Sequence, residues 1–299
     1  MQIRLNLHRY LFWQRLGLGV LLMLLLNSCS VQKLAVRSTG GILANGMSAL
    51  YEESDLILAE QTVGSNLKLL EAVIKSDPGN NGLLVMAAEG YTSYALGFVE
   101  DESPQRASQF YLRAKNYGLT ILKKNAKFAA ALDGNQNDFL AALNTFKAKD
   151  VAALFWTANA WGSYISLNKT DVQAIADLAR VQAMMETVLA LDETFYYGGP
   201  HLFLGTILAS RSPILGGDPQ KANEHFIASL QISHEKFLLT KYFYARTYAV
   251  QVQDRDLFKR LLQEILSAPD DLLPEQRLAN EIAKVKARRL LNQAEDLFL

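Results

Sequence analysis

The chain has 299 residues, half of them hydrophobic and 20% charged, and it holds 30 Lys and Arg against 30 Asp and Glu. This balance argues against a nucleic-acid-binding protein, which needs a concentrated basic face. The single cysteine excludes an intramolecular disulfide and a multi-thiolate metal site.

The first 28 residues have the order of charged and apolar residues that is typical of a secretory signal. Arg4, Arg9 and Arg15 precede an uncharged run from Leu16 to Leu26. At about 1.5 Å per helical residue, this run covers roughly half of a hydrocarbon core of about 30 Å. We therefore expect residues 1–28 to be an export signal that is removed. Its removal leaves 27 Lys and Arg against 30 Asp and Glu, because it contains three arginines and no acids.

The only cysteine, Cys29, follows in the sequence LNSC, which resembles a bacterial lipobox. A lipobox cysteine is diacylated on sulfur and becomes the new N-terminus, and two acyl chains hold a protein on a bilayer far better than one. Ser30 at the next position indicates the outer membrane in a Gram-negative envelope. We expect a periplasm-facing protein with lipid at Cys29 and a tether over 29–47. The alternative is ordinary signal cleavage with Cys29 as an incidental thiol.

Apolar residues at three-and-four spacing predict helices through most of residues 48–299. Helix pairs are expected near 48–76, 151–191 and 240–267, and 119–149 fits either a continuing helix or a loop. A last amphipathic helix, with Leu278 and Ile282 on its apolar face, is expected to cover one end of the array. Alternating strand patterns are absent. The predicted fold is all-α, with one helical domain over 48–299.

Helix starts and an internal repeat divide this domain. Ser103-Pro104 and Asp218-Pro219 combine an N-cap residue with proline at the first helical position, while TDVQ (170–173) is typical of a capping box. Asp150 and Asp254 are further N-cap candidates. A shift of 115 positions aligns 103–114 with 218–229 and Gly90 with Gly205. The spacing of Ala107, Tyr111 and Ala114, and of Ala222, Phe226 and Ser229, resembles the second helix of a tetratricopeptide repeat, so we expect an irregular array of antiparallel helix pairs.

The sequence contains no recognisable catalytic or cofactor motif. His201, His225 and His234 form no ligand pair at helical spacing, and HExxH, GxSxG, P-loop and GxGxxG patterns are absent. The acidic stretch VEDES (99–103) is interpreted as a solvated loop between two helices. We therefore predict no enzyme, no cofactor and no metal. A hydrolase remains the alternative if these histidines converge in a cleft.

Aromatic residues gather in two of the predicted helices. Trp156, Trp161 and Tyr164 share one, and Tyr242, Tyr244 and Tyr248 share another. They fit either core packing between stacked helices or a partner-binding groove on a concave face.

Several longer motifs resemble the T component (TatT) family associated with TRAP transporters. They are LLVMAAEGYTSYALGFVE, YYGGPHLFLGTILA, LGGDPQKANEHF and YFYARTYAVQVQD, spread between about Gly64 and Leu266. The resemblance implies a tetratricopeptide-like lipoprotein that binds the periplasmic solute-binding protein of a TRAP system. It also implies a homo-oligomer, with a trimer as the first expectation.

On this interpretation, the partner docks on the groove of the array and solute uptake is assisted. The expected contact residues are Tyr91, Trp156, Trp161, Tyr197 and Tyr244. The alternative function is a scaffold lipoprotein in outer-membrane or envelope assembly, which uses the same fold and anchor.

Overall fold

The computed structural model describes residues 41–42 and 45–298, and all regular secondary structure within them is helical. The predicted all-α fold is confirmed. The predicted signal, 1–28, and Cys29 lie outside the described residues. Residues 45–51 are already helical, so helical structure begins before the expected boundary at residue 48. Among the described helices, none combines the length and apolar character needed to cross a membrane.

Nine helices of at least twelve residues make up most of the described chain. They are α2 (Leu56–Ser76), α3 (Asn81–Tyr94), α4 (Pro104–Leu122), α7 (Val151–Leu167), α9 (Leu178–Leu191), α10 (Phe195–Ala209), α11 (Pro219–Ile232), α13 (Arg255–Leu266) and α14 (Arg277–Leu291). The shorter helices are α5 (Ala126–Ala131), α6 (Gln136–Leu143), α8 (Val172–Ala176), α12 (Leu238–Phe243) and α15 (Ala294–Leu297). Two π-helical turns, η1 (Ala95–Val99) and η4 (Tyr244–Ala249), extend α3 and α12, and 3₁₀ turns occupy η2 (Ala148–Asp150), η3 (Pro213–Leu215) and η5 (Pro274–Gln276).

The structure confirms some of the predicted helix starts and corrects others. Asp218 accepts from Lys221 N at 3.0 Å, and Asp254 accepts from Leu257 N at 2.8 Å, so both are N-caps. At the expected capping box the cap is Asp171, one residue later than Thr170. Asp150 does not cap α7 with its side chain. The open segment 119–149 contains the end of α4, then α5 and α6.

The two copies of the internal repeat share buried positions but differ in how their glycines pack. Ala107, Tyr111, Ala114, Ala222, Phe226 and Ser229 are all fully buried. A Cβ at Gly205 would lie 3.2 Å from the ring of Phe226, so α10 approaches α11 closely, as expected. A Cβ at Gly90 would instead meet Leu67 of α2 at 2.8 Å. The aligned glycines therefore allow close approach to different neighbours.

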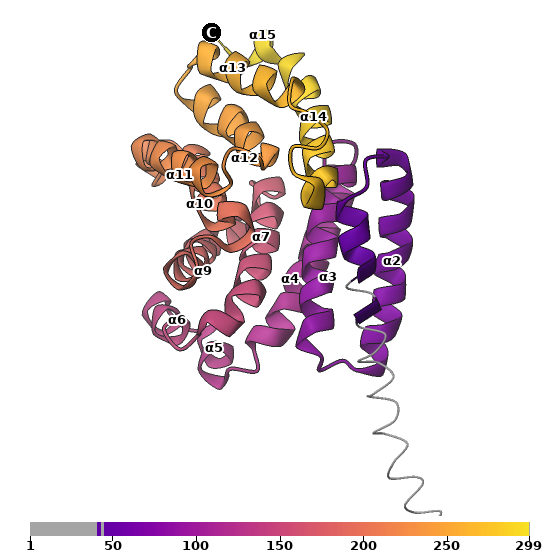
Figure 1. Ribbon diagram of the computed structural model, residues 1–299. Helices are drawn as coiled ribbons and strands as arrows, with labels where there is room; N and C mark the ends of the chain where they lie inside the picture. Colours follow the sequence, from indigo (N-terminus) through magenta and orange to yellow (C-terminus); the bar gives the residue numbers. More distant parts are fainter. Residues whose placement is uncertain (1–40, 43–44, 299) are drawn as a thin grey trace, which may run out of the picture.

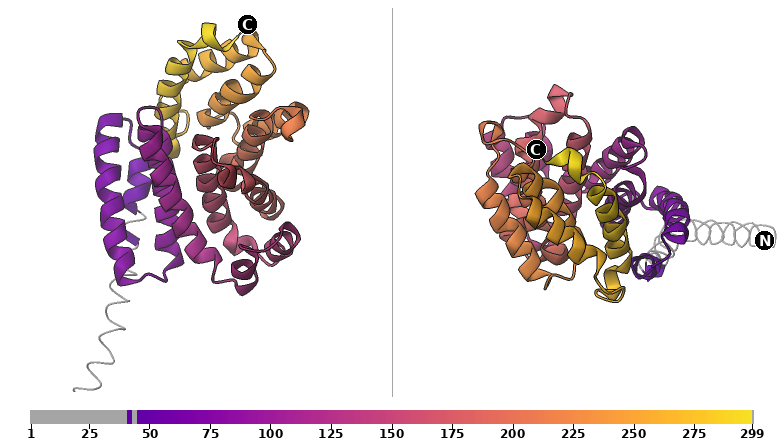
Figure 2. Two further views of the ribbon diagram at one scale, coloured as in Figure 1. Left: turned by 180° about the vertical axis from the view of Figure 1, so that it is seen from behind. Right: turned by 90° about the horizontal axis from the view of Figure 1, so that it is seen from above.

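The last long helix, α14, joins the two ends of the array instead of covering one of them. Its Leu278 and Ile282 belong to the apolar cluster built by α2, α3 and α4, whereas Ala283 and Ala287 belong to the cluster built by α12 and α13. Figures 1 and 2 show α14 between the C-terminal helices and the N-terminal α2–α3 pair. The amphipathic sequence thus has apolar residues on two sides, and the chain curls back on itself.

Candidate functional site

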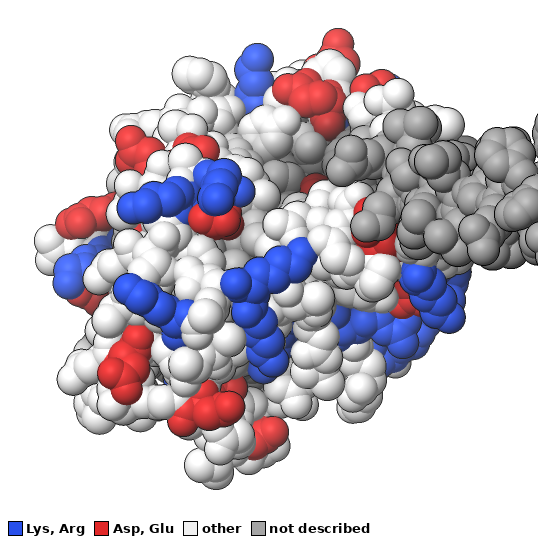
Figure 3. Space-filling model, turned by 90° about the horizontal axis from the view of Figure 1, so that it is seen from below, with Lys and Arg blue, Asp and Glu red and all other residues white. Residues whose placement is uncertain are grey.

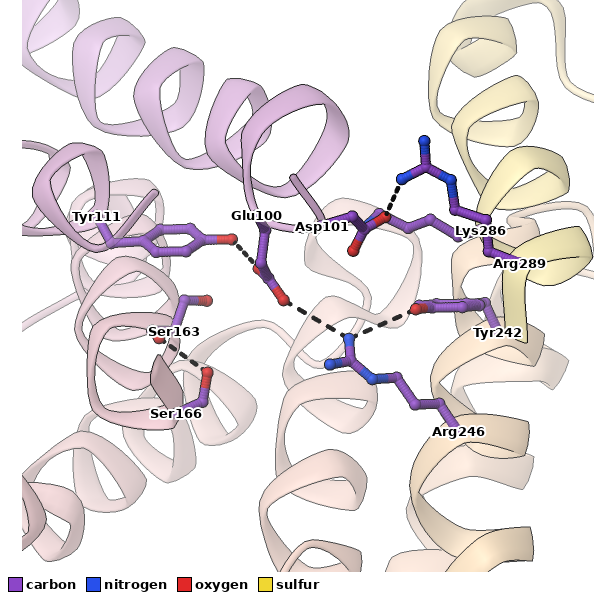
Figure 4. A network of polar contacts seen from close by, with 9 residues as sticks. All are labelled: Glu100, Asp101, Tyr111, Ser163, Ser166, Tyr242, Arg246, Lys286 and Arg289. Atoms are coloured by element: carbon purple, nitrogen blue, oxygen red, sulfur yellow. Dashed lines mark hydrogen bonds and ion pairs between the residues drawn. The ribbon is translucent and has the colours of Figure 1, made fainter. Parts of the chain in front are cut away.

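Two π-helical turns meet where α14 closes the array. Turn η1 is followed directly by Glu100, whose N–H donates to Ala95 O at 2.8 Å. Turn η4 contains Arg246. An extra residue in a helical turn rotates the side chains that follow, and such turns are frequent at functional sites. Here they bring Glu100 and Arg246, from opposite halves of the chain, to one place (Figure 4).

Glu100 is the centre of a chain of polar contacts across this place. Tyr111 Oη donates to Glu100 Oε2 at 2.5 Å, and Arg246 Nη1 lies 3.6 Å from Glu100 Oε1. Arg246 also donates to Tyr242 Oη at 3.4 Å. Burial lowers the pKa of the Arg246 guanidinium, but Tyr242 and the nearby carboxylates Glu100 and Asp101 outweigh it and raise that pKa. The arginine is therefore charged, and 41% of its side chain is exposed.

A second set of ion pairs lies beside this chain and involves Asp101. Lys286 Nζ contacts its two carboxylate oxygens at 2.9 and 2.8 Å, and Arg289 Nη1 contacts it at 3.3 Å. Only 2% of the Lys286 side chain is exposed. Arg289 also pairs with Glu102 at 2.8 Å. We call these groups, Glu100, Asp101, Tyr111, Tyr242, Arg246, Lys286 and Arg289, the closure junction.

VEDES spans the turn between η1 and α4, as predicted, and Asp101 and Glu102 are exposed, so the interpretation as a solvated loop is confirmed in part. Glu100 is largely buried and Asp101 contacts a buried lysine, because α14 covers this turn. The junction contains three cations, Arg246, Lys286 and Arg289, and two carboxylates, Glu100 and Asp101. The arrangement holds two parts of the chain together and presents two half-exposed guanidinium groups, those of Arg246 and Arg289. It contains no nucleophile paired with a base.

Tyr91, one of the expected partner contacts, is buried in a different polar cluster between α2, α3 and α4. Its hydroxyl donates to Glu71 Oε1 at 2.7 Å, and Tyr117 Oη donates to the same atom at 3.1 Å. Arg113 Nη1 lies 3.1 Å from Glu71 Oε1, and Lys68 also pairs with this carboxylate. Burial disfavours the charged carboxylate, but the hydrogen bonds from Lys68, Tyr91 and Tyr117 outweigh it and lower the pKa of Glu71 to about 2.

This lowered pKa predicts a pH dependence of stability. Because the folded-state pKa of Glu71 lies below its ordinary value of 4.5, its contribution is present above that value and is lost as pH falls towards 2. Glu71→Gln should be less stable than the wild type at neutral pH, and the difference should shrink through this acid range. Urea unfolding at a series of pH values measures it. A constant difference would contradict the assignment.

The other four expected contact residues lie apart from Tyr91 in the core or near it. Trp156 and Tyr197 join an aromatic cluster around Tyr196, with ring centroids 4.8 and 5.8 Å from that ring. Tyr196, Tyr197 and Gly198 have positive φ angles of 48°, 60° and 75°, and this left-handed turn starts α10. Tyr197 is partly exposed. Trp156 is buried, as core packing requires.

Trp161 and Tyr244 are also buried. Lys115 Nζ lies 3.8 Å from the Trp161 ring centroid, a cation–π contact. Tyr244 stacks on Phe226 at 4.8 Å and donates to Asn223. The five aromatic residues therefore form no common surface, and four of them contribute to the core. Their proposed role in partner binding stays a prediction.

Two of the three histidines in the described part of the chain are neighbours, although their spacing in the sequence did not predict a pair. His201 Nδ1 lies 2.9 Å from His225 Nδ1, between α10 and α11, and Glu193 lies 3.5 Å from the other ring nitrogen of His201. Burial and the charge of His201 lower the pKa of His225. Within residues 41–42 and 45–298, no group of three or more His, Cys, Asp or Glu side chains is arranged to hold a metal ion.

Comparison with known proteins identifies the family. The model of the TRAP transporter T-component family matches residues 52–298, which is nearly all of the described chain. An uncharacterized protein of Treponema pallidum (strain Nichols) is 24% identical over 310 aligned residues, covering 92% of this chain and 95% of that protein. Both π-helical turns and the closure junction lie inside the matched range. The chain belongs to the TRAP transporter T-component family.

Proposed function

We propose that this protein is a lipid-anchored, periplasm-facing accessory protein that binds the solute-binding protein of a TRAP system and assists solute uptake. The family match over 52–298 is the observation that carries the proposal, since it makes the chain a component of such a system. The signal-like residues 1–28 and the LNSC sequence support the anchor. The family consists of transport components, which supports a binding role and not catalysis.

In this proposal the protein acts by holding its partner at a defined place near the membrane. An anchor on the bilayer confines a bound partner to a thin layer near the membrane and raises its effective concentration there. The rigid helical array then sets the distance and orientation of the partner. Because Tyr91, Trp156, Trp161 and Tyr244 are buried, the docking surface must consist mainly of other residues. A homo-oligomer is part of the proposal and provides several docking surfaces per assembly.

Crosslinking in intact cells, followed by purification and mass spectrometry, tests the partner. We expect a periplasmic solute-binding protein as the main crosslinked species, together with a second copy of this chain. Recovery of barrel-assembly or cell-wall proteins in its place would support the envelope scaffold and overturn the transport proposal.

Replacing the lone cysteine tests the anchor separately. Cys29→Ser removes the acylation site, so we expect the protein to leave the membrane fraction while its helical domain stays folded. Fractionation of cells and circular dichroism of the released protein measure the two effects. A Cys29→Ser protein that stayed in the outer membrane would show that no lipid at this position holds it there.

A further inference from the structure

One end of the molecule carries a cluster of exposed lysines. In the sequence, residues 103–132 contain six Lys and Arg and no Asp or Glu. Asn125 Nδ2 donates to Thr145 Oγ1 at 2.7 Å, which brings the α4–α5 turn beside the segment before η2. Lys124 Nζ donates to Gly79 O at 2.6 Å, which brings the α2–α3 turn to the same end of the molecule. We call this cluster the lysine end; its members are Lys75, Lys123, Lys124, Lys127, Lys147 and Lys149.

The charges of the lysine end are not neutralised by direct partners. All six lysines are exposed, and none of them has an ion pair with an acidic side chain in the part of the chain that the structure describes. Elsewhere Lys241, Lys284 and Lys286 each contact at least one carboxylate. Figure 3 shows this end of the molecule, where Lys and Arg lie across the middle of the face and acidic side chains mainly towards its edges.

Two observations favour a membrane over a protein as the occupant of this surface. Lysine is depleted in protein–protein interfaces, which use Tyr, Trp and Arg as anchors, whereas clustered lysines suit a diffuse layer of anionic headgroups. The described chain begins at residue 41 towards this end of the molecule (Figure 1), so this is the end at which the N-terminal part of the sequence joins the helical array.

We propose that the lysine end adsorbs to anionic phospholipid headgroups of the bilayer that holds the anchor. This proposal rests on the proposed lipid at Cys29. Adsorption fixes the orientation of the array, with α5 near the membrane and α13, at the opposite end in Figure 1, far from it. Each lysine near an anionic surface strengthens adsorption about fivefold at low salt, from roughly 1 kcal/mol per charge.

The processed lipoprotein, reconstituted in phosphatidylcholine vesicles with and without phosphatidylglycerol, tests the orientation. Because Cys29 is acylated, an introduced cysteine is the only free thiol, so a dye at Ala130→Cys in α5 reports its distance from a lipid-borne acceptor by energy transfer. Ser267→Cys, after α13, is the control position. We expect phosphatidylglycerol to raise transfer from position 130 but not from 267, and high salt to reverse the rise.

A charge-matched pair of variants assigns the effect to the lysine end. Lys123→Gln, Lys127→Gln and Lys147→Gln together should abolish the rise. Lys169→Gln, Lys236→Gln and Lys259→Gln together remove three exposed lysines from other surfaces and should preserve it. Sedimentation with the same vesicles at low salt measures binding of the Cys29→Ser protein carrying either triple substitution. The first set should weaken binding about a hundredfold, and the second set should leave it unchanged.

The outcomes separate this proposal from the proposed function. Equal transfer with both lipid compositions would overturn membrane adsorption while leaving partner binding intact. Loss of crosslinking to the solute-binding protein by the first triple variant, with unchanged transfer, would make the lysine end a protein-docking surface and also overturn it. If the wild-type chain failed to insert into vesicles, the proposed lipid at Cys29 would be wrong. The sedimentation of the Cys29→Ser protein would then test by itself whether the lysine end binds anionic lipid.

Discussion

Gly118→Ala is expected to destabilise the protein by about 3 kcal/mol or more, although alanine is the better helix former by about 1 kcal/mol. Gly118 lies in α4 where it packs on α7. An added Cβ would be 1.9 Å from Thr157 Oγ1 and 3.2 Å from Thr157 Cα. The second contact is with backbone, so a rotamer change cannot relieve it, and the two helices must separate. Packing therefore outweighs helix propensity.

Urea unfolding measures this effect against a control at an open position. A Cβ at Gly79, between α2 and α3, meets nothing within 4 Å, so Gly79→Ala should change the free energy of unfolding by less than about 0.5 kcal/mol. Adding Thr157→Ala to Gly118→Ala should recover part of the loss, because it removes the closest contact atom. A Gly118→Ala protein as stable as the wild type would show that α4 and α7 are further apart.

Asp101→Ala is expected to have the second large effect, about 3 kcal/mol, because it leaves the Lys286 ammonium buried without its carboxylate. Removing the lysine and keeping the carboxylate should lower the free energy of unfolding by less. In Lys286→Met, Asp101 keeps its contact with Arg289 and is 29% exposed, so water and a second cation stabilise it. The methionine also fills most of the space of the lysine stem. We expect roughly 1 kcal/mol or less from this substitution.

A double-mutant cycle distinguishes this asymmetry from a general loss of packing. With Lys286→Met present, Asp101→Ala should cost less than it does alone, since the stranded charge is gone. Limited proteolysis of the α14 region should become faster in Asp101→Ala, because the closure junction holds the first and last parts of the array together. Additive effects of the two substitutions on the free energy of unfolding would contradict a direct interaction between Asp101 and Lys286.

The sequence predicted well what depends on local pattern. Three-and-four periodicity predicted helices through most of residues 48–299 because the residues that repeat on one helical face are the ones that become buried. Asp218 and Asp254 were identified as caps because capping is decided within four residues. Thr170 was a wrong choice because Asp171, its neighbour, competes for the same backbone N–H groups, and pattern alone does not rank the two.

The candidate site was less predictable. Nothing in YALGFVE or YFYARTYAV identifies a π-helical turn, since the extra residue is set by packing of neighbouring helices. Asp101 and Lys286 are 185 residues apart in sequence, and their pairing follows from the path of the whole chain. The sequence favoured core packing for Trp156 and Trp161 over a binding groove but could not decide it for each residue, and their burial in the structure does.

Composition, periodicity and contiguous motifs were enough to establish the helical class, the family, the signal-like N-terminus and the absence of recognisable catalytic motifs. Three features could be seen only in the folded chain: α14 closes the array, Glu100 and Arg246 meet, and lysines from three separate segments share one end. The reason is physical: contacts between distant residues depend on how all intervening helices pack, and a small change in one helix position moves every later side chain.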